Sequence, residues 1–255
     1  IKPIIGCDVY VARNGIAERK TQRDNMSLVL LAENQTGYNN LVKLVSHAHL
    51  RGMYYKPRID KEMLREYAEG LIGLSGNLRG EVNDACRDED LERAEKLALE
   101  YADILGPNNF FLELMDHGEA DEKTANRNLI ALAQKTGLPL VATNDVHYVK
   151  QEHAEAHDVL TCLQRGTLVA DPNRYRYPGD QFYLKSSAEM EALFAKQPDA
   201  IANTIEIAKR CNVEFFFPDK AEDLHFPQFP LPDPFVRGID YLIHLGKQGL
   251  KDLYD

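Results

Sequence analysis

Short apolar runs alternate with longer amphipathic segments along the first part of the chain. The runs are rich in Val, Ile, Leu and Phe, and they span residues 4–11, 27–32, 70–75, 110–115 and 138–143. Residues 119–136 instead place apolar side chains three and four positions apart, which is the spacing of a helix, and Gly137 ends it. Strands that alternate with helices of this length predict parallel β–α units. We therefore predict an α/β fold, either barrel-like or doubly wound, because periodicity alone fits both.

Charge and cysteine usage narrow the class of function. The formal net charge is −10, whereas a surface that gripped DNA phosphates over its whole face would be basic. The four cysteines lie far apart and form no CxxC pair, so a zinc knuckle is not indicated and a reducing cytoplasm is predicted. No apolar run approaches the ~20 residues that a membrane-spanning helix needs.

The character of the chain changes after about residue 150. Helices are predicted at 152–163, 187–195 and 198–211, and a segment rich in Phe and Pro follows Val213. Prolines prevent regular structure in that segment, so we predict an extended linker, with a new helix from about Phe235. We also expect both ends of the sequence to be cuts through a longer protein.

The sharpest chemical feature is Asp145 and His147, which follow the run at 138–143. Side chains two positions apart on an extended segment point the same way, so both can face one point. The carboxyl end of a parallel strand is where α/β folds place ligand chemistry, and carboxylate plus imidazole suits zinc, manganese or iron. The alternative is that Asp145 caps a turn and His147 is a hydrogen-bonded core residue.

Polar residues recur at other strand ends. Asn77 follows the run at 70–75, Asp116 follows the run at 110–115, and Asp8 lies on the first run. Together they predict a polar rim at one edge of the sheet. Asn77 and Asp116 each lie close to a glycine, so turn formation is the competing explanation for both.

Other polar residues are weaker candidates. His47 and His49 lie on nearly opposite faces of a helix, so we expect them to face solvent rather than share a metal. His157 is predicted to be a packed or capping histidine. Lys56 and Arg58 could contact phosphate, although a packed turn with exposed cations fits as well. Neither a Gly-rich phosphate loop, nor GxSxG, nor HExxH is present.

A series of segments resembles the PHP domain of bacterial DNA polymerase III alpha subunits. The segments are residues 1–8 (IKPIIGCD), 52–60 (GMYYKPRID), 141–148 (VATNDVHY), 156–160 (AHDVL), 182–186 (FYLKS), 203–208 (NTIEIA) and 210–213 (RCNV). They run in order along nearly the whole chain. The resemblance implies a distorted (β/α)7 barrel that lacks its first strands, with a metal cluster at the carboxyl rim. It also implies a PHP domain over 1–212, a Phe/Pro-rich linker over 213–234 and the start of the polymerase palm or thumb region over 235–255.

The resemblance assigns the metal positions to five residues of this chain. Asp145 and His147 match the family pattern, and Asp8 stands where the family usually has Glu. Ser27 and Asn77 stand where the family usually has His and often Cys, and a hydroxyl and an amide are poor ligands for zinc or manganese. A His-x-His that the family also uses would precede Ile1. The resemblance therefore implies a degenerate metal site.

The resemblance further implies a part of a replicative polymerase. The polymerase aspartates that hold magnesium would lie beyond Asp255, so no catalytic residue is assigned here, and the motifs assign no residue to nucleic-acid binding. The implied partners are the DNA primer-template, a proofreading exonuclease subunit, the sliding clamp and other replicase subunits, in the cytoplasm and without a membrane. Two alternatives remain open at this point: a metal-dependent 3′–5′ exonuclease and a stand-alone PHP phosphoesterase.

Overall fold

The computed structural model describes residues 1–19, 25–217 and 229–254. The chain divides into two compact units, Ile1–Glu214 and Phe215–Asp255. Part of the loop predicted between the first two strands, residues 20–24, lies outside the described residues, and so does the section 218–228 of the Phe/Pro-rich segment.

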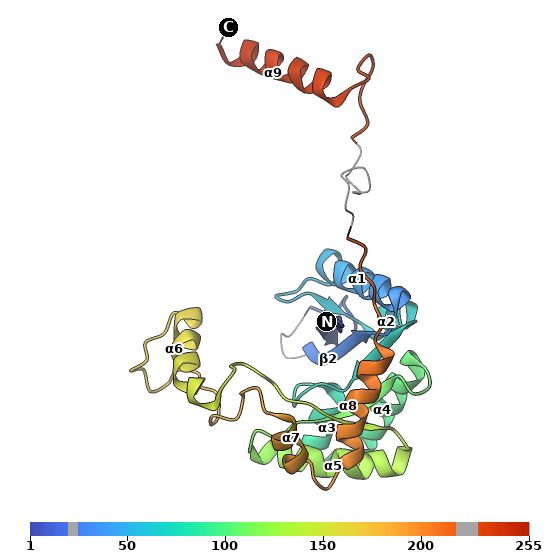
Figure 1. Cartoon of the computed structure of the whole chain (residues 1–255), viewed down its shortest axis with the longest axis vertical. Helices are drawn as coiled ribbons and strands as arrows, with labels where there is room; N and C mark the ends of the chain where they lie inside the picture. Colours follow the sequence, from blue (N-terminus) through green and yellow to red (C-terminus); the bar gives the residue numbers. More distant parts are fainter. Residues whose placement is uncertain (20–24, 218–228, 255) are drawn as a thin grey trace. The chain divides into compact units, whose positions relative to one another are not determined.

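A mixed sheet forms the centre of the first unit (Figure 1). Its described strands are β1 (Gly6–Ala12), β2 (Asn25–Ala32), β3 (Arg58–Ile59), β4 (Leu71–Leu74), β5 (Phe110–Leu114) and β6 (Leu140–Ala142), in the order β3-β1-β2-β4-β5-β6. The strands β3 and β6 stand at the two ends of this order. The described strands thus make a six-stranded sheet, and an α/β fold is confirmed.

The prediction of parallel β–α units is wrong for one described strand, β2, which runs antiparallel to the other five. β1 pairs with β2, and β2 with β4, in antiparallel fashion, whereas β4, β5 and β6 are parallel to one another. β1 and β2 follow each other without an intervening described helix, and antiparallel neighbours need no crossover. An apolar run such as residues 28–32 fits a parallel or an antiparallel strand equally well, because its pattern indicates burial and not strand direction.

Helices follow the strands through the first unit. They are α1 (Gln35–Leu50), α2 (Lys61–Glu66), α3 (Glu81–Arg87), α4 (Leu91–Leu105), α5 (Ala120–Thr136), the 3₁₀ turn η2 (Gln151–His153), α6 (Ala154–Arg165), α7 (Ser187–Leu193) and α8 (Pro198–Arg210). The second unit contains α9 (Gly238–Tyr254). The described part of the chain contains no helix that is both long and apolar enough to cross a membrane.

Local sequence fixes several helix ends. The Asn34 side chain accepts a hydrogen bond from the Gly37 backbone N–H at 3.0 Å and so caps α1. Gly37 packs directly on the backbone of Gly70, where a side chain would not fit. Ser186 and Glu189 form a capping box at the start of α7. Gly137 ends α5 in a left-handed conformation, as the sequence indicated.

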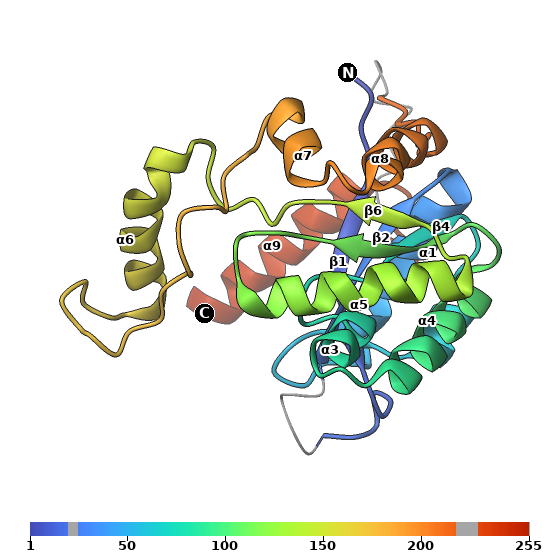
Figure 2. The same cartoon turned by 90° about the horizontal axis from the view of Figure 1, so that it is seen from below.

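The two faces of the sheet carry cores of different size. On the larger core, alternate residues such as Val9, Leu28 and Leu112 pack with α1, α3, α4 and α5. The smaller core contains Ile72, Leu74, Phe111 and Val141, together with Ile207 and Cys211 at the end of α8. Figure 2 shows α3, α4 and α5 on one side of the strands and α8 on the other. The polar rim described next lies on the face with the smaller core.

The predictions of exposed cations and histidines hold for Lys56 and His49, which are exposed, and are wrong for Arg58 and His47. Arg58 is only 1% exposed, and its guanidinium donates to the backbone oxygens of Gly52, Ile16 and Glu18 at 3.0–3.1 Å. It joins two loops, one with Ile16 and Glu18 and one with Gly52, to β3 rather than offering a phosphate contact. His47 is partly buried and stacks on the Tyr67 ring with 5.6 Å between centroids.

Candidate functional site at the strand ends

Strand alternation places three polar residues on the face of the smaller core. Asp8 on β1 pairs with Val29 on β2, so these two share a face, and Ser27 lies two residues from Val29. Glu113 lies two residues after Phe111, which belongs to the smaller core. Asp8, Ser27 and Glu113 are therefore neighbours on one side of the sheet because of the period of the strands.

Asp8 and Ser27 are directly bonded. The Ser27 hydroxyl donates to Asp8 Oδ1 at 2.6 Å. Loss of water around the carboxyl group raises the pKa of Asp8, the bond from Ser27 opposes this, and the nearby charge of Asp145 adds to it. The structure thus brings Asp8 and Asp145 close enough to repel each other. The Ser27 hydroxyl proton is therefore engaged in the hydrogen bond to Asp8.

Asp145 and His147 lie together after β6. His147 Nε2 is 3.2 Å from Asp145 Oδ1, and both side chains are about one-third exposed. Asp145 and His147 thus lie together, as the spacing predicted, and their carboxylate and imidazole contact each other directly. The backbone of the same segment is held by Phe182, whose carbonyl accepts the His147 N–H at 2.8 Å.

Glu113 is a buried carboxyl group that sequence reasoning did not single out. Its Oε1 accepts a hydrogen bond from the Thr143 hydroxyl at 2.5 Å, and its Oε2 accepts the Gly76 N–H at 2.9 Å. The pKa of Glu113 is raised to about 7, mainly by burial and in smaller part by the charges of Asp8 and Asp145, and the two hydrogen bonds oppose this rise. The sequence signal for Glu113 was its position inside an otherwise apolar run, because a buried carboxyl group there needs hydrogen-bond partners.

His117 and Glu122 form a second buried group that the sequence did not assign. His117 Nδ1 is 2.6 Å from Glu122 Oε1, and the His117 backbone N–H donates to Glu122 Oε2 at the same distance. His117 Nε2 accepts the backbone N–H of Asp145 at 3.2 Å, so the ring carries its proton on Nδ1. A carboxylate that fixes one ring nitrogen is also how proteins orient metal-binding histidines. A Glu five residues after a His at a strand end was the only sequence signal.

Asn77 and Asp116 act as turn formers. The Asn77 side-chain oxygen accepts the Arg79 N–H at 2.9 Å, and Asp116 Oδ1 accepts the Gly118 N–H at the same distance. Both contacts run to the residue two positions on, which is the Asx-turn geometry. Asn77 nevertheless lies beside the rim.

Aromatic rings close the rim on one side. The Phe182 ring stacks on His117 with 4.3 Å between centroids, and Tyr177 packs on His147 at 4.5 Å. His157, predicted to be packed, contacts both His147 and Tyr177. Behind this wall lies a cavity of about 150 Å³, lined by groups that include Asn77, Arg79, His117, Asp145, Tyr177 and Phe182.

The donor atoms at the rim do not add up to a metal site as they are arranged. Among the described residues, no three His, Cys, Asp or Glu side chains are grouped so that they could hold a metal ion. Ser27 donates to Asp8, the Asn77 oxygen is used in its turn, and His117 Nε2 faces a backbone N–H. The carboxylates and imidazoles of the rim therefore bond mainly to each other and to the backbone.

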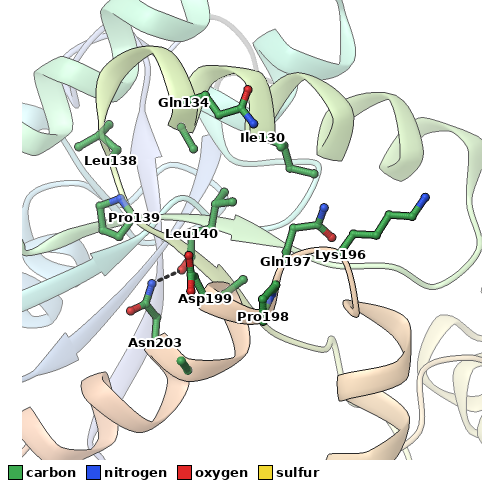
Figure 3. Close-up of a pocket in the computed structure, with 13 residues that line it drawn as sticks. Ile130, Gln134, Leu138, Pro139, Leu140, Lys196, Gln197, Pro198, Asp199 and Asn203 are labelled. Carbon is green, nitrogen blue, oxygen red and sulfur yellow. Dashed lines mark hydrogen bonds between the residues drawn. The ribbon is translucent and has the colours of Figure 1, made fainter.

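A larger groove of about 620 Å³ lies elsewhere, between the end of α5, the start of β6 and the first turn of α8 (Figure 3). Its lining is mostly apolar and includes Ile130, Leu138 and Leu140. Asn203 donates to the Leu140 carbonyl at 2.7 Å, while Lys196 extends away from the other side chains. No cluster of titratable groups meets there among its lining residues, so it is not our candidate site.

The fold and the rim define a class of protein: a mixed α/β domain with carboxylates and histidines gathered at the strand ends. Residues 1–117 match the family model of the PHP domain. Residues 1–117 thus belong to the PHP domain family, and the resemblance seen in the sequence motifs is confirmed.

Relatives of the chain are DNA polymerase III alpha subunits. It is 43% identical to that of Treponema pallidum over 100% of this chain and 22% of the relative. It is 43% identical to that of Thermus aquaticus (91% and 20%) and 38% identical to that of Borreliella burgdorferi (100% and 22%). The chain thus spans about a fifth of the length of the curated relatives that it matches.

Proposed function

We propose that this chain is the PHP part of a replicative DNA polymerase III alpha subunit, whose longer polypeptide extends a DNA primer on its template. The observation that carries the proposal is identity of 38–43% to three such subunits over nine-tenths or more of this chain. The polymerase aspartates and their magnesium belong to other parts of that polypeptide.

The proposed organisation follows the sequence. Residues 1–212 are the PHP domain, 213–234 a linker, and 235–255 the start of the palm or thumb region. The six-stranded sheet supplies most of a distorted seven-stranded β/α barrel, which further strands of the longer polypeptide would close. The partners are primer-template DNA, a proofreading exonuclease subunit, the sliding clamp and other replicase subunits, and the location is the cytoplasm.

Within that subunit, the PHP part acts as a scaffold with a degenerate metal site. Asp8, Asp145 and His147 are the positions that could still ligate zinc or manganese, whereas Ser27 and Asn77 supply a hydroxyl and an amide. The bonds that Ser27 and Asn77 make support this proposal, because both side chains stabilise protein structure instead of presenting a free ligand.

A metal-dependent 3′–5′ exonuclease is the second candidate. The observation in its favour is the gathering of Asp8, Glu113, His117, Asp145 and His147 on one rim. Metal held there would serve as a Lewis acid for phosphodiester hydrolysis. No feature of the described residues favours a stand-alone phosphoesterase, and the relatives are subunits about five times as long as this chain.

The longer protein that contains this chain provides the test. Purified without chelators, it would be assayed for bound zinc and manganese, for primer extension with magnesium, and for 3′-end trimming. The scaffold proposal expects primer extension, metal well below one equivalent per chain, and no trimming above that of an Asp145→Asn variant. Stoichiometric metal and trimming that Asp145→Asn abolishes would instead establish the exonuclease. Absence of primer extension would reject the polymerase assignment.

A further inference from the structure

Helix α6 stands away from the sheet on an arm made by residues 144–186. Both views show this helix beside the loop that follows it and apart from the helices that cover the sheet (Figures 1 and 2). The arm leaves the domain after β6 and returns where Tyr148 and Tyr183 pair. It carries none of the residues of the larger core.

The arm is held together by its own side chains. Arg174 is buried, and both ends of its guanidinium donate to the Asp158 carboxylate of α6. Thr161 and Cys162 are buried on the same side of α6, and Arg165 lies over the Tyr175 ring at 4.1 Å. One face of α6 is thus fixed against the loop, and its opposite face is presented in a defined position.

That opposite face is apolar. Ala156, Val159, Leu160 and Leu163 recur at the spacing of one helix face, and all four are exposed. Leu163 is 73% exposed, and Leu168 in the following loop is 76% exposed. We call Val159, Leu160, Leu163 and Leu168 the α6 stripe. Packing on the larger core does not explain why these positions are apolar, because α6 contributes no residue to that core.

We propose that the α6 stripe is an intramolecular docking face, covered by another segment of the alpha-subunit polypeptide outside these 255 residues. The inference rests on the proposed function. Its support is the size of the relatives: the arm lies within the part that matches them, and about four-fifths of each relative lies outside that part. A group of neighbouring exposed apolar side chains, unlike single scattered ones, marks an interaction site.

Charge around the α6 stripe defines what would cover it. Glu152 and Glu155 are exposed at the N-terminal end of the helix, beside the apolar residues. The matching surface is therefore apolar at its centre, with a Lys or Arg facing Glu155. The two acidic residues also disfavour an anionic lipid surface as the occupant.

Thiol labelling of the full-length polypeptide tests whether the face is covered. Leu160→Cys places a thiol in the α6 stripe, and Asn173→Cys places a control thiol at an exposed position of the loop that packs on the opposite face of α6. Labelling by a maleimide is followed for each thiol by mass spectrometry and normalised to its rate in denaturant. A covered face labels at least about tenfold more slowly than the control, because access then requires local opening.

Each other outcome is decisive. Equal normalised rates at Leu160→Cys and Asn173→Cys would overturn the proposal. Protection that disappears on dilution would show that a second copy covers the stripe, and it would overturn the proposal as well. Primer extension by the same preparations separates the two failures: extension with unprotected Leu160→Cys rejects only the docking face, whereas lack of extension rejects the polymerase assignment.

Discussion

The His117 imidazole and the Glu122 carboxylate form a buried pair with 2.6 Å between Nδ1 and Oε1, and they hold the segment that carries Asp145. The other face of the pair is closed by the Phe182 ring, which lies nearly parallel to the imidazole. Residues 117, 145 and 182, which are distant in sequence, therefore meet at this one histidine. The position of Asp145 and His147 depends on it.

Glu122→Ala would leave this histidine without its acceptor. We expect a loss of about 3 kcal/mol in the free energy of unfolding, because removing one partner of a buried pair leaves the other without compensation. The amide of Asp145 would also exchange faster. Urea unfolding and hydrogen exchange measure the two effects. His153→Ala, at an exposed histidine, is the control, and equal stability of the two variants would contradict the role given to the pair.

Glu113→Gln would remove a titratable group from the end of β5. The pKa of Glu113 is raised from 4.5 to about 7 in the folded protein, so the folded state binds the proton more tightly than the unfolded state. The stabilising effect is complete below about pH 4.5 and is lost as the pH rises to about 7. A shift of this size corresponds to about 3 kcal/mol.

Glutamine can keep both contacts of Glu113, since its oxygen accepts the Gly76 N–H and its amide donates to Thr143 Oγ. We therefore expect the wild type to lose stability relative to Glu113→Gln between pH 4.5 and 7. Urea unfolding over that range measures the difference. A difference that does not change with pH would show that the carboxyl group is not titrating there.

Arg58→Lys would break the junction between β3 and two loops. A lysine ammonium has no planar fork and cannot reach the carbonyls of Gly52, Ile16 and Glu18 together. We expect a loss of about 2 kcal/mol, since buried carbonyls would lack donors. Urea unfolding measures it, with Lys56→Ala at the exposed neighbour as the control. A loss below that of the control would refute the structural role of Arg58.

Sequence periodicity predicted much of the fold because it reports burial. The runs at 27–32 and 110–115 became β2 and β5, and the helix at 119–136 became α5, with ends displaced by a residue or two. The direction of β2 was missed, since an apolar strand carries no mark of its orientation. β3 was missed because it has two residues and follows a proline.

The site was predicted in part for a similar reason. The two-residue spacing of Asp145 and His147 is local, so it could be read directly from the sequence. Glu113 and His117 depend on partners that only the folded sheet and the start of α5 bring near, namely Thr143, Gly76 and Glu122. A single sequence does not show which distant residue satisfies a buried charge.

Asp158→Asn would loosen the arm without touching the sheet. The Arg174 guanidinium holds the pKa of Asp158 below its usual value. The ion pair therefore stabilises the arm fully at a pH above that usual pKa, and this stabilisation is lost as the pH falls through the lowered pKa. We expect backbone amides of α6 to exchange at least about tenfold faster at neutral pH in Asp158→Asn, after correction for intrinsic rates, because local opening then meets less resistance. Hydrogen exchange with mass spectrometry resolves α6 from α5, whose amides should be unchanged.

Asp171→Asn, in the loop of the same arm, is the matched control. Faster exchange throughout the domain would mean that Asp158 supports the whole fold, and unchanged exchange in α6 would mean that the burial of Thr161 and Cys162 holds the arm without the ion pair.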